Sequence, residues 1–161
     1  MITGLLAAAL MTAPWDSPLT LHGIGSLRVG TPVAALRRMG ATHEDYPDPD
    51  VDCSYWQTPR WPGLLMMVSG GRVVRIETED QRYRTASGAR IGMTEAEIRR
   101  LYGPAMSVGP HHYTGPDGHY LTYRARSEPY ALIIETDPGT GRAITMRVGT
   151  WEAVQLVEGC S

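Results

Sequence analysis

The chain has 161 residues, of which 15 are basic and 17 acidic, and its formal net charge is −2 at pH 7. A hydrophobic content of 42% with 20% charged residues is that of a globular chain, long enough for one ordinary domain or two very small ones. The near-neutral charge excludes a dedicated nucleic-acid binder, which normally carries a basic face, so we expect no nucleic-acid partner.

The chain begins with an apolar run, MITGLLAAALMTA, that ends before Pro14. As a helix rising about 1.5 Å per residue, it is too short to cross the roughly 30 Å hydrocarbon core of a membrane. Its small residues near a cleavage point are typical of a secretory signal. We predict that residues 1–13 are a signal-like segment and that the protein is periplasmic or secreted, without stable membrane insertion. The alternative is an apolar helix packed on the domain.

Two stretches of the chain resemble two later stretches in the same order. They are SLRVGTPVAALRRMGA (26–41) with GARIGMTEAEIRRLYG (88–103), and GRVVRI (71–76) with GRAITM (141–146). Self-similarity of this kind indicates duplicated structural units. We predict two tandem repeats, 19–80 and 87–150, followed by a C-terminal tail, 151–161.

In the first repeat, a turn is expected at Gly30. A short helix follows, with Thr31 as its N-cap and Pro32 at its first position, where the missing N–H costs nothing. Gly40 is expected to end this helix. A polar, proline-rich loop, 43–52, then leads to three strands. They are expected at about 53–57, 64–68 and 73–78, with a hairpin turn at 69–71.

The second repeat has the same order of elements. Thr94 is expected as N-cap, with Glu97 completing a capping box, and Gly103 is expected to end the helix. A loop, 107–118, precedes strands at about 119–124, 130–136 and 143–148. We therefore predict an α+β fold of two tandem repeats. Each is a short helix plus a three-stranded antiparallel meander, with the helices packed on one sheet face.

Cys53 and Cys160 are the only cysteines in the chain. Neither lies in a CxxC motif, and nothing near either one suggests a catalytic base or a set of zinc ligands. In an exported protein the economical interpretation is a disulfide that ties the C-terminal tail to the middle of the chain. Two buried free thiols are the alternative.

A helix-entry pattern, Ile91-Gly92-Met93-Thr94, precedes a helix, Gly103-Pro104, an aromatic strand and a hairpin. This arrangement resembles the small BamE-like (SmpA/OmlA) envelope domain. The tandem duplication is similar to the β-lactamase inhibitory protein, which is built from two units of related architecture. GHYLT (118–122) and the EGC ending (158–160) are similar to a group of uncharacterised secreted bacterial proteins. The resemblance implies an exported domain that presents a sheet and loops to another protein, without catalysis of its own.

Aromatic residues surround the first strand of each expected meander. Alternation along the strands places half of them on the face away from the helices, where Trp and Tyr commonly anchor interfaces. Arg75 and Arg147 are expected on that same face. The alternative is that the aromatic side chains complete the core of a protein without phenylalanine. The predicted binding residues are Tyr55, Trp56, Trp61, Arg75, His112, Tyr113, Tyr120 and Arg147.

Three histidines, His111, His112 and His119, lie close together in the sequence. Imidazoles can ligate Zn²⁺ or Cu²⁺, but adjacent histidines tend to point apart and the loop contains Gly and Pro. We therefore predict no metal ligands. A periplasmic module that binds a small molecule or metal through residues 107–119 is the alternative function.

Three further patterns lack the spacing that their chemistry needs. The aspartates of residues 48–52 are not followed by the Gly and Glu of a calcium loop, and the glycines of residues 23–30 do not form GxGxxG. No GxSxG elbow marks a nucleophile. We predict no enzyme and no cofactor. The expected function is non-catalytic binding of another envelope or secreted protein, as an inhibitor or as an accessory of envelope assembly.

Overall fold

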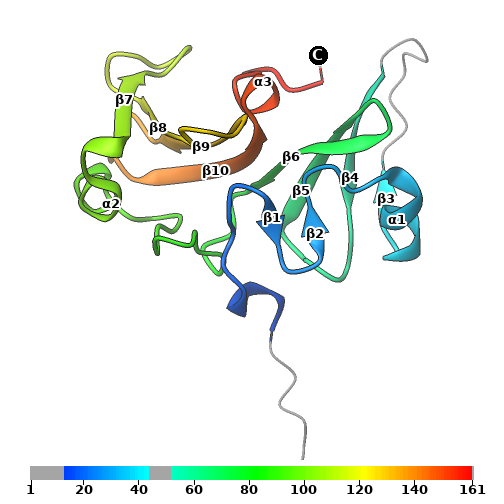
Figure 1. The fold of residues 1–161 in the computed structure, drawn as a ribbon. Helices are drawn as coiled ribbons and strands as arrows, with labels where there is room; N and C mark the ends of the chain where they lie inside the picture. Colours follow the sequence, from blue (N-terminus) through cyan, green and yellow to red (C-terminus); the bar gives the residue numbers. More distant parts are fainter. Residues whose placement is uncertain (1–12, 44–51, 161) are drawn as a thin grey trace, which may run out of the picture.

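The computed structural model describes residues 13–43 and 52–160 (Figure 1). Apart from Ala13, the expected signal-like segment lies outside these residues. Strands β3 to β10 form one antiparallel sheet in the order β3-β4-β5-β6-β10-β9-β8-β7, and β1 and β2 form a separate pair. The strands are β1 (Gly23–Ile24), β2 (Leu27–Arg28), β3 (Thr42–His43), β4 (Cys53–Gln57), β5 (Leu64–Ser69), β6 (Arg72–Thr78), β7 (Met106–Pro110), β8 (His119–Arg124), β9 (Tyr130–Thr136) and β10 (Ala143–Thr150).

The helical elements of the described residues are short. They are η1 (Pro14–Asp16), α1 (Val33–Arg38), α2 (Glu95–Tyr102), η2 (Gly103–Ala105) and α3 (Trp151–Val154). The longest, α2, has eight residues. No helix within 13–43 and 52–160 is long and apolar enough to cross a membrane.

The predicted α+β fold of two helix-plus-meander repeats is wrong, because the described residues are mainly β, with short helices, and form an eight-stranded antiparallel sheet beside the β1–β2 pair. Each half of the chain contributes four strands to that sheet rather than three. The additional strands, β3 and β7, fall in or next to segments expected to be polar loops. The residues of β7, MSVGP, include Gly and Pro, which are depleted in strands. The composition of this segment therefore does not predict a strand. The two predicted helices, α1 and α2, pack against the same core, whereas α3, which was not predicted, packs in a separate cluster.

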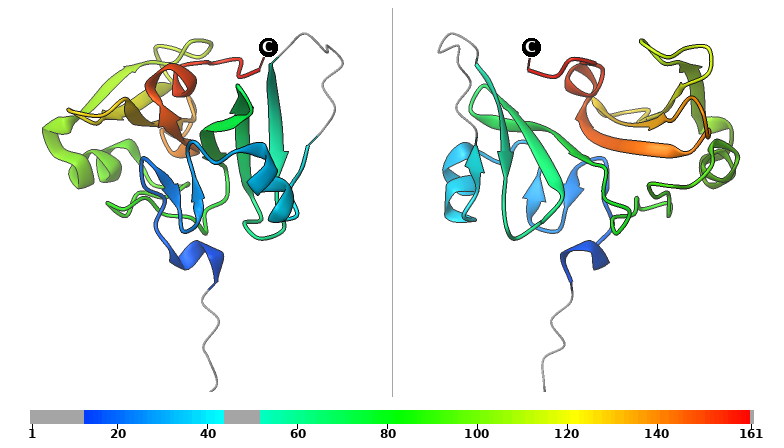
Figure 2. Two further views of the ribbon diagram at one scale, coloured as in Figure 1. Left: turned by 45° about the vertical axis from the view of Figure 1, so that its right-hand side comes forward. Right: turned by 180° about the vertical axis from the view of Figure 1, so that it is seen from behind.

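The sheet has a core face and an opposite face, which we call the α3 face. Leu36 of α1, Ile98 of α2 and the β1–β2 pair cover the core face. Figures 1 and 2 show these elements on one side of the curved sheet and α3 with the C-terminus on the other. The strands contribute alternate apolar residues to the core, among them Met66, Ile76, Leu121, Ile134, Met146 and Val148.

Matching contacts fasten the segments that precede α1 and α2 to the sheet. Arg72 Nη1 donates to the carbonyl of Gly30 at 2.9 Å, and Arg142 Nη1 donates to the carbonyl of Gly92 at 2.7 Å. Both glycines have a positive φ, +90° and +88°, which side chains rarely adopt. The turn predicted at Gly30 is therefore confirmed.

The helix starts follow the expected capping chemistry in only one case. Thr94 caps α2, and the capping box with Glu97 is present as predicted. The expectation for α1 is wrong, because Pro32 occupies the N-cap and the helix begins at Val33. Thr31 Oγ1 instead accepts a hydrogen bond from the Arg28 N–H at 3.1 Å, which stabilises the preceding turn.

Tyr83 is fully buried and donates its hydroxyl to the carbonyl of Pro62 at 2.8 Å. Burial raises the pKa of Tyr83 to about 12 from 10.0. Because the unfolded chain releases this proton first, the neutral, buried tyrosine contributes fully below pH 10 and loses its contribution as the pH rises to about 12.

Tyr83→Phe should therefore reduce the loss of stability between pH 10 and 12, and should lower stability at pH 7 by about 1–2 kcal/mol because the Pro62 carbonyl loses its donor. Urea unfolding of both proteins at pH 7 and pH 11 measures the two effects. Equal pH dependence in wild type and variant would contradict this assignment.

Candidate binding surface on the α3 face

A line of charged side chains crosses the α3 face, and we call it the charge row: Arg75, Glu77, Arg147, Glu135 and His111. Arg75 and Glu77 alternate along β6 and so share a face, and Arg147 on β10 pairs directly with Glu77. Glu135 lies on β9, the next strand. The pairing of adjacent strands thus brings residues distant in sequence into one row.

Opposite charges alternate along the charge row. Arg75 Nη2 lies 2.7 Å from Glu77 Oε2, Arg147 Nη1 contacts Glu135 Oε1, and His111 Nε2 lies 3.5 Å from Glu135 Oε2. The two arginine side chains are 4% and 5% exposed, and both glutamate side chains are 16% exposed. Charges this deeply buried are stable only when they are paired and hydrogen-bonded.

Aromatic rings flank the charge row at both ends. The Arg75 Nη2 donates to the Tyr55 hydroxyl at 2.8 Å. At the other end, Arg147 Cζ lies 5.6 Å from the centre of the Tyr120 ring, a cation–π distance, and the His111 ring stacks on Tyr120 at 4.6 Å. The rings shield the guanidinium groups from water and hold their orientation.

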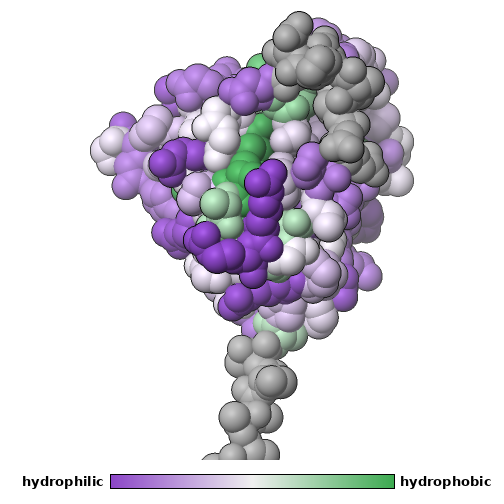
Figure 3. All heavy atoms as spheres, turned by 90° about the vertical axis from the view of Figure 1, so that its right-hand side faces the viewer, coloured by the Kyte–Doolittle hydropathy of each residue, from purple (hydrophilic) through white to green (hydrophobic). Residues whose placement is uncertain are grey.

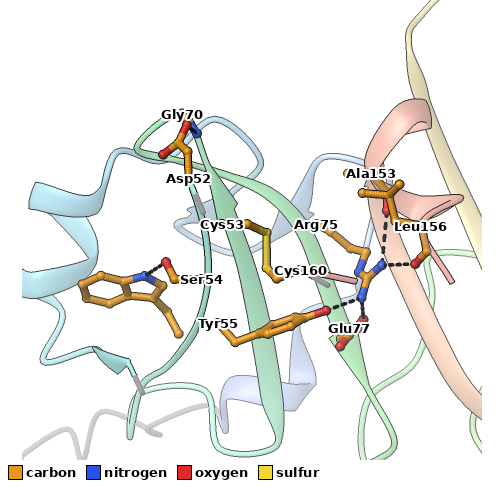
Figure 4. Close-up of a disulfide and its surroundings, with 11 residues drawn as sticks. Asp52, Cys53, Ser54, Tyr55, Gly70, Arg75, Glu77, Ala153, Leu156 and Cys160 are labelled. Carbon is orange, nitrogen blue, oxygen red and sulfur yellow. Dashed lines mark hydrogen bonds and ion pairs between the residues drawn. A yellow bond between two sulfur atoms is a disulfide. The ribbon is translucent and has the colours of Figure 1, made fainter. Parts of the chain in front are cut away.

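Residues 151–160, which we call the C-terminal segment, lie across the same face and include α3. Arg75 Nη1 donates to the carbonyls of Ala153 at 3.2 Å and Leu156 at 2.8 Å, and Arg147 Nε donates to the carbonyl of Val154 at 2.7 Å. The last carbonyls of a helix have no partner within it, and a cation there is favourable. Figure 4 shows Arg75 between Tyr55, Glu77 and the carbonyls of Ala153 and Leu156.

The predicted disulfide is present and fastens the C-terminal segment to β4. Cys53 and Cys160 have a Cα–Cα distance of 5.3 Å and a sequence separation of 107 residues (Figure 4). Gly159, next to Cys160, must be glycine: its φ is +64°, and a Cβ there would lie 1.9 Å from the Tyr55 hydroxyl oxygen. The EGC ending therefore packs directly against the charge row.

Next to the charge row, a groove of about 520 Å³ remains open at the ends of β4, β5, β6 and β10. Leu65, Thr145, Glu77 and Glu79 are among its lining residues. Burial raises the pKa of Glu77 above its ordinary value, and the opposing effect of Arg75 and Arg147 is smaller. The groove is lined by Gln57, Gly63, Leu64, Leu65, Glu77, Thr78, Glu79, Asp80 and Thr145.

The predicted binding residues fall into three places. Tyr55, Arg75, Tyr120 and Arg147 come together on the α3 face, as the contacts above show. The arginines, however, are covered by the C-terminal segment rather than open to solvent.

The remaining four lie elsewhere. Trp56 and Trp61 are 3% and 4% exposed and belong to the core on the opposite side of the sheet, which is the structural alternative considered for the aromatic residues. His112 and Tyr113 lie in the β7–β8 connection, where Tyr113 is 61% exposed. These four residues therefore do not contribute to the charge row or to the groove.

Sequence reasoning missed Glu77 and Glu135, although a signal for Glu77 was present. Glu77 lies two residues after Arg75 on the same strand, so it must share the face of Arg75. Glu135 had no such arginine on its own strand, and only the register of β9 against β10 brings it near Arg147.

Two of the three histidines of the β7–β8 region share partners, because Tyr113 lies beside both His111 and His112, and the His112 N–H donates to the Tyr120 hydroxyl at 3.4 Å. His111 lies against Tyr120 and Glu135, His112 packs edge-on against Tyr113, and His119 Nδ1 lies 2.7 Å from Glu95 Oε2 on α2. Within the described ranges, no group of three His, Cys, Asp or Glu residues is placed to hold a metal ion. Two of the aspartates considered as a calcium loop, Asp48 and Asp50, lie outside those ranges.

The side of the molecule formed by α1 and β4 offers little apolar surface. Figure 3 shows it as mostly hydrophilic, with one narrow apolar strip between polar side chains, in the part not covered by the grey atoms. The α3 face thus differs from this side, because it combines a groove with aromatic rings and half-buried carboxylates.

No protein-family model and no curated protein matches the chain. Its structure is similar to that of the uncharacterized protein yfeY of Escherichia coli, with a TM-score of 0.54 and 12% identity over 83% of this chain and 99% of that chain. Two weaker similarities are to a cysteine-rich secretory protein of Staphylococcus aureus (TM-score 0.49, 12% identity, 81% of this chain and 47% of that one) and to an extracellular protein containing an SCP domain of Bacillus anthracis (TM-score 0.49, 11% identity, 79% and 45%).

None of these three structures is described as BamE-like or as a β-lactamase inhibitory protein, so that resemblance stays a prediction. The disulfide is compatible with a secreted protein. At 12% identity, the likeness to yfeY shows a shared fold alone.

Proposed function

We propose that this chain is a non-catalytic binding domain that works outside the cytoplasm and holds a partner protein in the groove beside the charge row. The disulfide supports the compartment, because such bonds form and persist in oxidising environments. We propose that this compartment is either the periplasm or the extracellular medium.

The observation that carries the proposal is the groove itself. Its lining combines the apolar side chain of Leu65 with three acidic residues, Glu77, Glu79 and Asp80. Arg75 pairs with Glu77 and Arg82 pairs with Asp80. The raised pKa of Glu77 means that its negative charge is incompletely compensated by its neighbours. An added cation would stabilise that charge. We therefore propose that the partner inserts a basic side chain from an extended segment.

The charges of the α3 face favour binding over catalysis. Glu135 and Glu77 are each engaged by an arginine, and both cysteines form the disulfide. The resemblance to envelope-binding domains points in the same direction.

Glu79→Lys tests this proposal without disturbing the fold, because Glu79 is exposed at the end of β6. The probes are extended nonapeptides of matched length that carry two arginines, two aspartates or no charge. Wild type should prefer the arginine peptides, and the variant should bind them at least about tenfold more weakly, since attraction becomes repulsion inside a partly desolvated groove. Fluorescence anisotropy of labelled peptides measures the affinities.

Asp117→Lys provides the matched control, because Asp117 is an exposed carboxylate in the β7–β8 connection, away from the groove. This variant carries the same change of net charge and should bind like wild type. Equal loss of affinity in both variants would mean that the net charge of the protein, and not the groove, determines peptide binding. If wild type shows no preference for the arginine peptides, the proposal that the partner inserts a basic side chain is wrong.

A further inference from the structure

The C-terminal segment covers the guanidinium groups of Arg75 and Arg147 on the α3 face. Two guanidinium groups, those of Arg75 and Arg147, lie side by side on the α3 face and donate to three main-chain carbonyls of this segment. Side chains of the segment take no part in these bonds. The site thus recognises the end of a helical turn rather than a particular sequence.

One donor of this site has no acceptor. Among the described residues, no partner reaches the buried Nε of Arg75, although both of its terminal nitrogens are bonded. An unpaired buried donor costs about 1–3 kcal/mol, so the segment fits the two arginines incompletely. A ligand with a carboxylate could satisfy this donor, because a carboxylate has two oxygens with several acceptor positions.

The two halves of the C-terminal segment are held differently. Trp151 to Leu156 make the carbonyl contacts, and Val154 packs against Ala131 and Ile133. Beyond Leu156, the disulfide at Cys160 is the covalent link that returns the chain to β4. Leu156 itself is 46% exposed, whereas Val154 is fully buried, so the apolar burial of this segment is concentrated in α3.

We propose that Arg75 and Arg147 form a binding site for a peptide that presents carboxylate or main-chain carbonyl oxygens, and that the Cys53–Cys160 disulfide keeps the C-terminal segment in that site. Reduction opens it: an external dithiol supplies two electrons and two protons, the S–S bond breaks, two thiols form, and the dithiol becomes a disulfide. The segment then exchanges with an acidic peptide from another protein. This proposal does not rest on the groove.

The test uses the full chain and a synthetic peptide of residues 150–158, TWEAVQLVE, which contains the three carbonyls that accept hydrogen bonds from Arg75 and Arg147 but no cysteine. After reduction, amide hydrogen exchange in residues 151–157 should accelerate at least about tenfold while exchange in β6 and β10 stays unchanged. The peptide should bind the reduced chain and not the oxidised one. Arg75→Gln in the reduced chain should weaken peptide binding at least about tenfold.

Val154→Asp keeps the test decisive if the reduced chain unfolds. It leaves the disulfide intact but places a charge against Ala131 and Ile133, which should release α3 and allow the peptide to bind. Unchanged exchange of residues 151–157 on reduction would overturn the proposal. So would equal peptide binding to the oxidised and reduced chains, or a folded Val154→Asp variant that does not bind the peptide.

Discussion

Replacing Arg147 by methionine should lower the free energy of unfolding by about 3–5 kcal/mol. The Arg147 side chain is 5% exposed, contacts Glu135 and donates to the Val154 carbonyl. Methionine fills similar space but removes both interactions, so the Val154 carbonyl loses its arginine donor and Glu135 keeps only His111 beside it. Guanidinium unfolding followed by tryptophan fluorescence gives the change in free energy.

Arg142→Met is the matched control, because Arg142 is exposed and its hydrogen bond to Gly92 lies at the surface. Its effect should be about 1 kcal/mol or less. Adding Glu135→Leu to Arg147→Met should recover part of the lost stability, since the carboxylate that lost its arginine is then removed as well. Similar losses for Arg147→Met and Arg142→Met would mean that the charge row is not the buried network described above.

Removal of the disulfide, as Cys53→Ala with Cys160→Ala, should lower the free energy of unfolding by up to about 4–5 kcal/mol. The bond closes a loop between positions separated by 107 residues, so the unfolded chain gains much conformational freedom when it is lost. The midpoint of guanidinium unfolding should fall accordingly. Wild type unfolded in the presence of a dithiol should match the double variant.

A double variant whose midpoint equals that of oxidised wild type would contradict this expectation. It would mean that the C-terminal segment stays in place through its carbonyl contacts and the packing of Val154 alone. The same result would weaken the case for a disulfide-held site.

Local pattern predicted the longer strands well. β4, β8 and β9 have the expected bounds, and β5, β6 and β10 differ by one or two residues at their ends. These strands are rich in β-branched and aromatic residues and are bounded by Gly, Pro and Asp turns. β3 and β7 lack that composition, and they are held in the sheet by their partners β4 and β8 instead. The fold class was wrong for this reason.

The candidate site depended even more on contacts between distant residues. Alternation predicted Arg75, Arg147 and half of the aromatic residues on one face, without saying which aromatic residues. The structure brings Tyr55 and Tyr120 together with the two arginines there. The sequence around residues 151–160, however, does not predict that the C-terminal segment packs across that face. The cysteine pair indicated its attachment, but not that two arginines would bind its carbonyls.

Chemical-shift mapping of the isotopically labelled full chain, titrated with the arginine nonapeptide, tests the central claim most directly. The account predicts that the largest shifts fall on amides around the groove, at Gln57, Leu65, Glu77, Glu79 and Thr145. It also predicts that the shifts disappear in the Glu79→Lys variant and persist in Asp117→Lys. Largest shifts in the β7–β8 connection around Tyr113, or no shifts at all, would contradict the assignment of the groove as the binding site.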